Sequence, residues 1–477
     1  MPESKHEEAR ILIDGIWDEE IVPILADYIR IPNKSPAFDA DWAAHGYMDQ
    51  AVALFADWAR EKLVHFPGAT LDIVRLEGRT PLIFIDVPGA SSGTILMYGH
   101  LDKQPEMEGW AEGMGPWQPV IKDGKLYGRG GADDGYALFA SLTALLAAKR
   151  QGIAHARTVI LIEASEESGS PDLPAYIHHL KDRIGTPDLV ICLDSSCGNY
   201  EQMWLTTSLR GLVMGNLSVR VLREGLHSGA VSGIVPSSFR ILRSLIERIE
   251  SAATGEILLP ELIAEIPEGR RSEARQAAAI LADQVWSELP LAGSTRPMGD
   301  DNAALILARS WKPQLAVTAI DGYPKPADGG NVLLPFSVAK LSMRLPPTVD
   351  AARAVEALKT ELERDPPYGA SVSFDIVDVD NGWSAPELAD WLRRALDEAS
   401  LDCFGAPTAF HGEGGSIPFM GMLGEKFPGT QFVVTGVLGP QSNAHGPNEF
   451  LHIAFAKKLT LAISLLIGFH ADQKQGD

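Results

Sequence analysis

Residues 94–102 read TILMYGHLD, and this stretch decides the fold class. An apolar run is followed directly by a histidine and an aspartate. The same arrangement, a short run rich in Ile, Val and Leu that leads into polar residues, recurs at 158–164 (TVILIEA), 189–193 (LVICL) and 431–437 (QFVVTGV). Such runs are typical of strands in a parallel sheet that is buried on both faces. Because helical patterns such as 136–150 (YALFASLTALLAAKR) lie between them, the sequence predicts an α/β domain with a mainly parallel sheet and helices on both faces.

The middle of the chain follows a different pattern. Apolar and polar residues alternate in 212–222, 338–344 and 371–380, with helical patterns at 238–250 and 350–363 between them. A period of two indicates strands with one covered face and one exposed face. We therefore predict an inserted α+β domain of the split β-α-β, ferredoxin-like kind. The predicted division is 1–207 and 386–477 for the α/β domain and 208–385 for the insertion, within which the pattern does not place 252–335.

Composition excludes several classes of partner. The chain has 41 basic and 63 acidic residues, a net charge of −22, and so repels phosphate backbones and anionic lipids. Three cysteines without a CxxC motif predict no disulfide framework, and the start MPESKHEEAR lacks the apolar region of a signal peptide. The apolar stretch 459–469 is about half as long as a membrane span and predicts a buried final helix. We expect a cytoplasmic protein with no nucleic-acid or membrane partner.

Residues of the type that binds metals follow the predicted strands: His100, Asp102, Asp133, Asp134, Glu166, Glu167, Asp194 and His445. Each alone has an ordinary structural explanation, such as a helix cap or a solvated charge. The carboxyl ends of parallel strands, however, meet at one edge of a sheet. So many carboxylates at one edge would be costly unless cations compensated them. Mixed His, Asp and Glu ligands without thiolate suit Zn²⁺, Mn²⁺ or Co²⁺, and their surplus suggests two metal ions that share a carboxylate and a water molecule.

The order of these motifs resembles a known family. GHLD, YGRGGADD, EASEESGS and NAHGPNE, at 99–102, 127–134, 163–170 and 443–449, are similar to motifs of the aminoacylase/carnosinase/glutamate-carboxypeptidase family of binuclear metallopeptidases. The cytosolic dipeptidase branch is the most similar one. The resemblance covers most of the chain, and it implies that the inserted domain is the family's lid and dimerisation domain.

The resemblance also implies roles for single residues. The implied metal ligands are His100, Asp133, Glu167, Asp194 and His445. Asp133 would bridge the two ions, His100 and Asp194 would bind one of them, and Glu167 and His445 the other. The peptide bond between Asp133 and Asp134 is expected to be cis.

Two further carboxylates have implied catalytic roles. Asp102 resembles the carboxylate that orients the ligand His100. Glu166 resembles the general base, which takes a proton from the attacking water and returns it to the departing amine. Glu166 should therefore not bind a metal ion directly, because a coordinated carboxylate is a poor base.

The resemblance implies substrate contacts outside the metal site. His227, in the motif HSG, would reach the active site of a neighbouring subunit and help to hold the oxyanion. Arg344 on a predicted strand, with Ser416 and Gly415 of the motif GGSIP, would bind the substrate carboxylate. Asn331 would be a further contact from the lid.

The chain departs from the family pattern at three places. Gly135-Tyr136 stands where many relatives have Lys-Gly. Asn381-Gly382-Trp383 stands near the place of a histidine found in carnosinase-type dipeptidases, which weakens the expectation of a carnosine-like preference. Lys103 follows Asp102 where small or apolar residues are common, so we expect a more basic pocket rim.

These observations predict a homodimeric metallopeptidase with two divalent ions per subunit, Zn²⁺ or Mn²⁺ with Co²⁺ as an alternative. Its substrates would be dipeptides or short peptides with a free C-terminal carboxylate. The nearest alternative is an amidohydrolase acting on N-acyl amino acids or other small amides. A non-catalytic binding relative is the alternative from another class, although both Glu166 and Asp133 are present. A single-metal isomerase is disfavoured, because ligands for two ions can be named.

Overall fold

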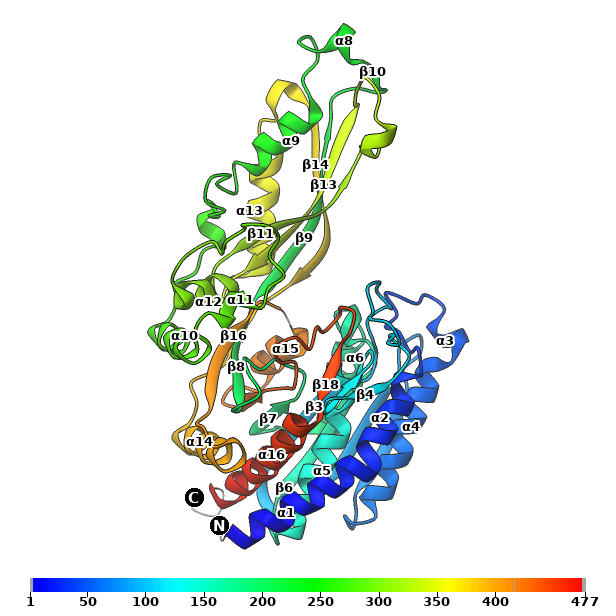
Figure 1. Cartoon of the computed structure of the whole chain (residues 1–477), viewed down its shortest axis with the longest axis vertical. Helices are drawn as coiled ribbons and strands as arrows, with labels where there is room; N and C mark the ends of the chain where they lie inside the picture. Colours follow the sequence, from blue (N-terminus) through cyan, green and yellow to red (C-terminus); the bar gives the residue numbers. More distant parts are fainter. Residues whose placement is uncertain (1–2, 416, 474–477) are drawn as a thin grey trace.

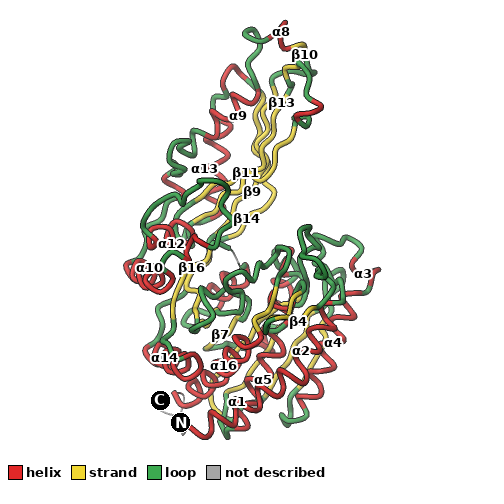
Figure 2. Tube along the Cα trace, viewed as in Figure 1, coloured by secondary structure: helices red, strands yellow, loops and turns green. Residues whose placement is uncertain are grey.

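The computed structural model describes residues 3–415 and 417–473, which form an α/β part and a long inserted part that projects from it (Figure 1). The first and last helices, α1 (Glu3–Ile16) and α16 (Ile453–Gln473), lie in contact at the far end of the α/β part (Figure 1). The inserted part carries the longest antiparallel strands, shown in yellow in Figure 2.

The main sheet of the α/β part has the strand order β1-β2-β6-β3-β7-β17. The last four strands in this order are parallel, whereas β1 and β2 pair antiparallel at one edge. The bounds are β1 Thr70–Val74, β2 Leu82–Val87, β3 Ser91–His100, β6 Ala156–Glu163, β7 Leu189–Cys192 and β17 Gln431–Val434. All four apolar runs singled out in the sequence lie in or overlap parallel strands, so the predicted α/β class is confirmed.

Helices cover both faces of this sheet, which explains why its inner strands carry long apolar runs. Ile95 and Met97 of β3 pack into the larger core, and Leu96 and Tyr98 pack into the core on the opposite face. Helices on the first face include α1, α2 (Val22–Ile29), α4 (Tyr47–Leu63), α5 (Ala137–Arg150) and α16. Helices on the second face are α6 (Leu173–His179), α7 (Lys181–Ile184) and α15 (Pro418–Lys426).

The last helix is buried, as predicted. On length and composition alone α16 could cross a membrane, but 72% of its most apolar stretch is buried inside the protein. Its apolar residues pack against α5 and α14 (Asp390–Phe404).

Two small sheets complete the α/β part. One has the order β15-β8-β16, with bounds β8 Trp204–Leu209, β15 Trp383–Ser384 and β16 Ala409–Glu413. The other has the order β18-β5-β4, with bounds β4 Val120–Lys122, β5 Lys125–Tyr127 and β18 Phe450–His452. The remaining short helix of this part is α3 (Trp42–His45).

The inserted part is a four-stranded antiparallel sheet covered by two helices, as predicted for a ferredoxin-like insertion. Its strand order is β11-β13-β9-β14, with bounds β9 Gly211–Arg220, β11 Gln314–Asp321, β13 Phe336–Leu345 and β14 Ser371–Asp380. Helices α9 (Ser238–Ile246) and α13 (Ala351–Glu363) pack on it. Both begin after a capping residue: the side chains of Ser237 and Asp350 accept a hydrogen bond from the first helical turn.

The segment 252–335, which the sequence pattern did not place, divides between the two parts. It forms α10 (Glu268–Leu281), α11 (Gln284–Ser287), α12 (Asn302–Ser310), β11 and β12 (Val332–Leu333). Strand β11 extends the inserted sheet, whereas α10 buries Ala274, Ala277 and Leu281 in the larger core of the α/β part. The boundaries after 207 and 385 stay a prediction.

Candidate metal centre

The candidate site lies where the parallel strands of the main sheet end. His100 is the last residue of β3, and Asp194 comes two residues after β7. Glu166 and Glu167 occupy the turn after β6, Asp133 lies just before α5, and His445 lies in the loop between β17 and β18. The strand ends meet at one edge, as the sequence predicted, because neighbouring strands run in the same direction.

The predicted ligands form two groups that share one carboxylate. The groups are His100, Asp133 and Asp194, and Asp133, Glu167 and His445, and within each the ligand atoms lie within 4.8 Å of one another. His100 Nε2 lies 3.3 Å from Asp133 Oδ1 and 3.7 Å from Asp194 Oδ1. His445 Nε2 lies 3.0 Å from Asp133 Oδ2 and 3.3 Å from Glu167 Oε2. The geometry therefore places Asp133 between two adjoining sites, and its peptide bond to Asp134 is cis, as expected.

The pKa values of these residues are strongly shifted from their usual values. Burial raises the pKa of Glu167 well above its usual value, and Asp133 raises it further. Burial also raises the pKa of Asp194. Burial acts in the same direction on Asp133, but hydrogen bonds with His100 and His445 outweigh it and hold the pKa of Asp133 well below its usual value. The site is thus a buried concentration of negative charge that cations would stabilise.

The residues fit a pair of divalent cations. Oxygen Oε1 of Glu167 is buried and has no hydrogen-bond partner among the described residues. Leaving such an oxygen unpaired costs free energy, which coordination would recover. The donors are imidazole nitrogens and carboxylate oxygens, the set that binds Zn²⁺ and Mn²⁺.

Asp102 holds the turn that carries the two glutamates. Its Oδ1 accepts a hydrogen bond from the backbone N of Glu166 at 3.1 Å, and its Oδ2 accepts one from the backbone N of Glu167 at 3.0 Å. Oδ1 also lies 3.5 Å from Nδ1 of His100. One fully buried carboxylate therefore contacts residues of both ligand groups.

Glu166 lies beside the ligands but belongs to neither group. Its Oε2 is 3.9 Å from Nε2 of His100. Burial raises the pKa of Glu166 well above its usual value, and the nearby Asp194 adds to the effect. A raised pKa and a position next to the ligands suit a group that accepts and returns a proton.

Sequence reasoning did not assign a role to the pair Arg129 and Glu449. Arg129 Nη1 contacts Glu449 Oε2 at 2.5 Å, and both side chains are buried. Arg129 Nη2 also donates hydrogen bonds to the carbonyl oxygens of His445 at 3.1 Å and Gly446 at 3.0 Å. The pair therefore fixes the loop that presents His445. Arg129 lies in the motif YGRGGADD and Glu449 in NAHGPNE, so their presence in these motifs was the sequence feature that could have identified them.

Gln104 and Glu163 also support the ligand-bearing turn, and sequence reasoning assigned neither a role. Gln104 Nε2 donates a hydrogen bond to Oε2 of Glu167 at 2.6 Å. Glu163, buried at the end of β6, accepts hydrogen bonds from Tyr98, Ser165 and Ser170, and the two serines flank the turn that carries Glu166 and Glu167. Burial raises the pKa of Glu163 to about 7. Glu163 lies in the quoted motif EASEESGS, whereas nothing in the pattern marked Gln104.

A model of peptidase family M20/M25/M40 matches residues 96–468. The chain belongs to this family. The match spans the whole candidate site, from His100 to His445, and confirms the predicted resemblance and the predicted enzyme class, a metallopeptidase.

Curated relatives and solved structures agree with this family. The chain is 26% identical over 424 residues to the cysteinylglycine-S-conjugate dipeptidase of Corynebacterium striatum. The matched region covers 84% of this chain and 88% of that protein. The chain is also 27% identical over 344 residues to the human Beta-Ala-His dipeptidase, covering 70% and 66% of the two chains. The fold is similar to human carnosine dipeptidase 1, with a TM-score of 0.78, 20% identity, and coverage of 99% and 100%. The dipeptidase Dug1p of Saccharomyces cerevisiae gives a TM-score of 0.77, 20% identity and 98% coverage of both chains.

The predicted lid residues of this M20 chain lie together but far from its own metal ligands. His227 belongs to β10 (Leu226–His227), which pairs with β12 at the outer tip of the inserted part (Figure 1). The carbonyl oxygen of Asn331 accepts a hydrogen bond from the backbone N of Ser228 at 2.8 Å, so Asn331 is at the same tip. Both residues are exposed. Within one chain, the structure does not bring them to the metal centre.

The predicted carboxylate contacts lie nearer to the junction of the two parts. Arg344 is on β13, opposite Leu212 of β9, and is half-buried. Gly415 is exposed in the turn after β16. Ser416 lies outside the described residues.

The prediction that Lys103 makes the pocket rim more basic was wrong. Its side chain is buried, and Nζ donates hydrogen bonds to the carbonyl oxygens of Tyr28 at 2.6 Å and Ile31 at 2.7 Å. These carbonyls lie at and just beyond the C-terminus of α2, where a cation is stabilised by the helix dipole. Lys103 therefore caps a helix inside the protein.

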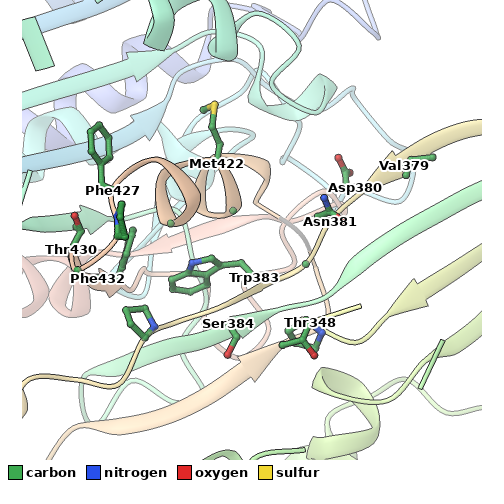
Figure 3. Close-up of a pocket in the computed structure, with 17 residues that line it drawn as sticks. Thr348, Val379, Asp380, Asn381, Trp383, Ser384, Met422, Phe427, Thr430 and Phe432 are labelled. Carbon is green, nitrogen blue, oxygen red and sulfur yellow. The ribbon is translucent and has the colours of Figure 1, made fainter. Parts of the chain in front are cut away.

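The cavity of Figure 3, about 650 Å³ in volume, lies where the inserted part meets the α/β part. Thr348, Asn381, Trp383, Met422 and Phe432 are among its lining residues, and none of the predicted metal ligands lines it. Asn381, which stands near the place of the family histidine, accepts a hydrogen bond from the backbone N of Ala351 at 2.9 Å. Here it caps α13.

Proposed function

We propose that this M20 chain hydrolyses dipeptides or very short peptides that carry a free C-terminal carboxylate, with two divalent metal ions. One observation carries the proposal: two ligand groups share Asp133, and Glu166 lies next to them without belonging to either. The relatives support peptides over N-acyl amino acids, because the cited ones are named dipeptidases.

The residues divide the reaction between them. Two cations bound at the site would lower the pKa of a shared water molecule and polarise the scissile carbonyl. Glu166 accepts the proton from the attacking water and later delivers it to the departing amine. Asp102 fixes the position of Glu166 by accepting a hydrogen bond from the backbone N–H of Glu166. We assign binding of the substrate carboxylate to Arg344, Gly415 and Ser416.

We also propose that the enzyme works as a homodimer in which His227 and Asn331 act in the partner's active site. Their distance from their own metal ligands supports this assignment (Figure 1). Apolar side chains exposed on the inserted part, such as Ile234 (82%), Val332 (47%) and Ile320 (57%), support a covered surface there. His227 would then help to stabilise the oxyanion of the neighbouring site.

The assignments of the metal ions and of the location rest on composition and chemistry. We propose Zn²⁺ or Mn²⁺ as the metal ions, with Co²⁺ as a substitute, because the donors are nitrogen and oxygen. We propose a cytoplasmic location without membrane or nucleic-acid partners, supported by the net charge of −22 and by the burial of α16.

The activity test uses metal-loaded protein and three matched substrate sets: free dipeptides, the same dipeptides amidated at the C-terminus, and N-acetyl amino acids. Release of amine from the free dipeptides alone is expected. Glu166→Gln should keep both metal ions but lose at least about 10²-fold in kcat. Cleavage of the N-acetyl compounds alone would move the chain to the acylase branch, and near-normal turnover by Glu166→Gln would remove the general-base assignment.

The dimer test uses complementation. His227→Ala is expected to lower kcat by roughly 10²–10³-fold. Mixing it with Glu166→Gln should restore part of the activity, because a mixed dimer contains one site with both residues intact. No recovery in dimers shown to be mixed would contradict the role of His227 across subunits.

A further inference from the structure

Asp194 lies beyond the end of its strand, and side chains from other parts of the fold hold the segment on both sides of it. The continuous pairing of β7 with β3 and with β17 ends at Cys192, two residues before Asp194. Even so, Oδ1 of Asp194 lies 3.7 Å from Nε2 of His100. The ligands of one ion have to be held to within about 0.5 Å, so contacts outside the strand must fix this segment.

The contact on the side before Asp194 comes from Tyr136, which directly precedes α5 (Figure 1). The hydroxyl of this buried tyrosine donates a hydrogen bond of 2.5 Å to the carbonyl oxygen of Leu193, the residue next to Asp194. Tyr136 belongs to one of the places where the chain departs from the family pattern. Gly135 packs so closely on Tyr28 that a Cβ there would lie 2.4 Å from Cε1 of Tyr28. The larger side chain therefore stands at the second position of this pair, where it reaches the segment of the ligand.

The contact on the side after Asp194 comes from Glu413, the last residue of β16 (Figure 1). Its Oε1 accepts hydrogen bonds from Oγ of Ser195 at 2.6 Å and from the backbone N of Ser196 at 2.9 Å. The same oxygen accepts hydrogen bonds from Oγ of Ser196 and Oγ1 of Thr206, both at 2.8 Å. A carboxylate that accepts several hydrogen bonds is stabilised in its charged form and binds its donors strongly. Because Thr206 lies on β8, Glu413 joins the segment after Asp194 to the small sheet β15-β8-β16.

The other ligand group is supported by different residues. Gln104 contacts Glu167, and Arg129 holds the loop of His445. In the part of the chain that the structure describes, the hydrogen bonds of the tyrosine hydroxyl and of the β16 carboxylate reach the segment of Asp194 and neither of these two ligands. The two metal sites therefore differ in the contacts on which they depend.

We propose that Tyr136 and Glu413 are positioning residues for one of the two metal ions, the ion bound by His100 and Asp194. The proposal rests on the metal pair of the proposed function and goes beyond it, because it assigns separate supports to the two ions. Without either contact Asp194 can move away from His100, and this ion is bound more weakly. The other ion keeps its ligands and their supports.

The test titrates metal-free protein with Mn²⁺ or Zn²⁺ in a calorimeter and resolves both binding steps. Tyr136→Phe removes the hydroxyl that contacts Leu193. Backbone hydrogen bonds between Leu438 and residues 195 and 197 remain, so the fold should be kept. We expect the Kd of one ion to rise roughly 10-fold and that of the other to change by less than about 2-fold.

The matched control is Tyr176→Phe. The hydroxyl of buried Tyr176 also donates a hydrogen bond of 2.5 Å to a carbonyl oxygen, that of Thr80, and it contacts no predicted metal ligand. Both Kd values of this control should stay at the wild-type level.

A second variant, Glu413→Gln, tests the other side of the segment. The same Kd should rise by about 10–100-fold, because a neutral side chain binds the donors less strongly. Glu363→Gln is its control, since Oε1 of Glu363 accepts a backbone hydrogen bond from Phe374 at 2.8 Å in the inserted part. At limiting metal, dipeptide hydrolysis should fall in both test variants, and excess metal should restore most of it.

Two results would overturn the assignment while the two-metal function stands. One is equal weakening of both binding steps in a test variant, which would indicate a general loss of structure. The other is a pair of Kd values within about twofold of wild type, well short of the effect of removing a residue that orients a ligand. Failure of the wild-type protein to bind two ions would overturn the proposed function itself.

Discussion

Replacing Asp102 by asparagine changes one oxygen of the carboxylate that holds the turn of Glu166 and Glu167. In the wild-type protein each oxygen of Asp102 accepts one backbone N–H, at 3.1 and 3.0 Å. The single side-chain oxygen of an asparagine can accept only one of these two backbone hydrogen bonds. Its NH₂ group then faces the other backbone N–H, so that two donors oppose each other. A hydrogen bond to a charged group contributes about 1.5–3 kcal/mol, and a buried N–H left without a partner costs a similar amount.

That energy is lost from a turn that carries one proposed metal ligand and the proposed base. A loss of about 1.4–2.8 kcal/mol corresponds to 10–100-fold in metal affinity, the range found when carboxylates that orient metal ligands are replaced. We expect Asp102→Asn to bind Zn²⁺ or Mn²⁺ about 10–100-fold more weakly and to lose kcat even at saturating metal. Calorimetric titration of metal-free protein measures the first effect, and dipeptide hydrolysis measures the second.

The matched control is Asp172→Asn. Asp172 also accepts a backbone hydrogen bond, from Thr80 at 2.9 Å, and pairs with Arg79 at 2.8 Å, but it contacts none of the predicted metal ligands. This variant should keep wild-type metal affinity. If Asp102→Asn also bound metal within about twofold of wild type, Asp102 would not be the residue that positions the site.

Two further predictions concern the surroundings of the site. Burial lowers the pKa of His411 to about 4, so between about pH 6.5 and 4 the unfolded chain binds more protons than the folded one. The folded protein should therefore lose on the order of 2 kcal/mol of unfolding free energy between about pH 7 and pH 5 through this residue, and urea unfolding of His411→Gln should show a smaller loss. Glu449→Gln leaves Arg129 buried and unpaired, which should destabilise the fold by about 3–5 kcal/mol and weaken metal binding through the His445 loop. Thermal unfolding and metal titration measure both effects, and unchanged values would refute the role of this ion pair.

Most of the candidate metal centre could be predicted because several ligands stand where a recognisable element begins or ends, whereas His445, in the loop between β17 and β18, was found through the resemblance of NAHGPNE to a family motif. His100 and Asp194 follow apolar strands, and Asp133 comes just before a helix, so local patterns and the parallel order of the strands brought these residues to one edge, and the family resemblance supplied their roles. The side chain of Gln104 contacts Glu167 across 63 positions of sequence, and no period in the sequence encodes such a pair.

The incorrect expectation for Lys103 has a related cause. Its neighbours in sequence are polar or charged, but its partners are carbonyls at the end of α2, more than 70 positions away. Whether a lysine is buried depends on such tertiary partners and not on its own segment. The segment 252–335 was not placed for the same reason: α10 is polar on most of its surface, and only a narrow apolar stripe, Ala274, Ala277 and Leu281, packs on the α/β part.

The same buried carboxylates that suit the centre for cations also make its metal-free form costly. Burial raises the pKa of Glu167 and Asp194, so neither charge is well compensated by the protein alone. Asp133 is the exception, because Nε2 of His100 lies 3.3 Å from its Oδ1 and Nε2 of His445 lies 3.0 Å from its Oδ2. Cations would take over this compensation for every ligand at once, since each group of three includes Asp133. Metal loading, local order of the Glu166–Glu167 turn and stability of the strand ends therefore depend on the same set of contacts, which is why a positioning residue such as Asp102 should affect all three.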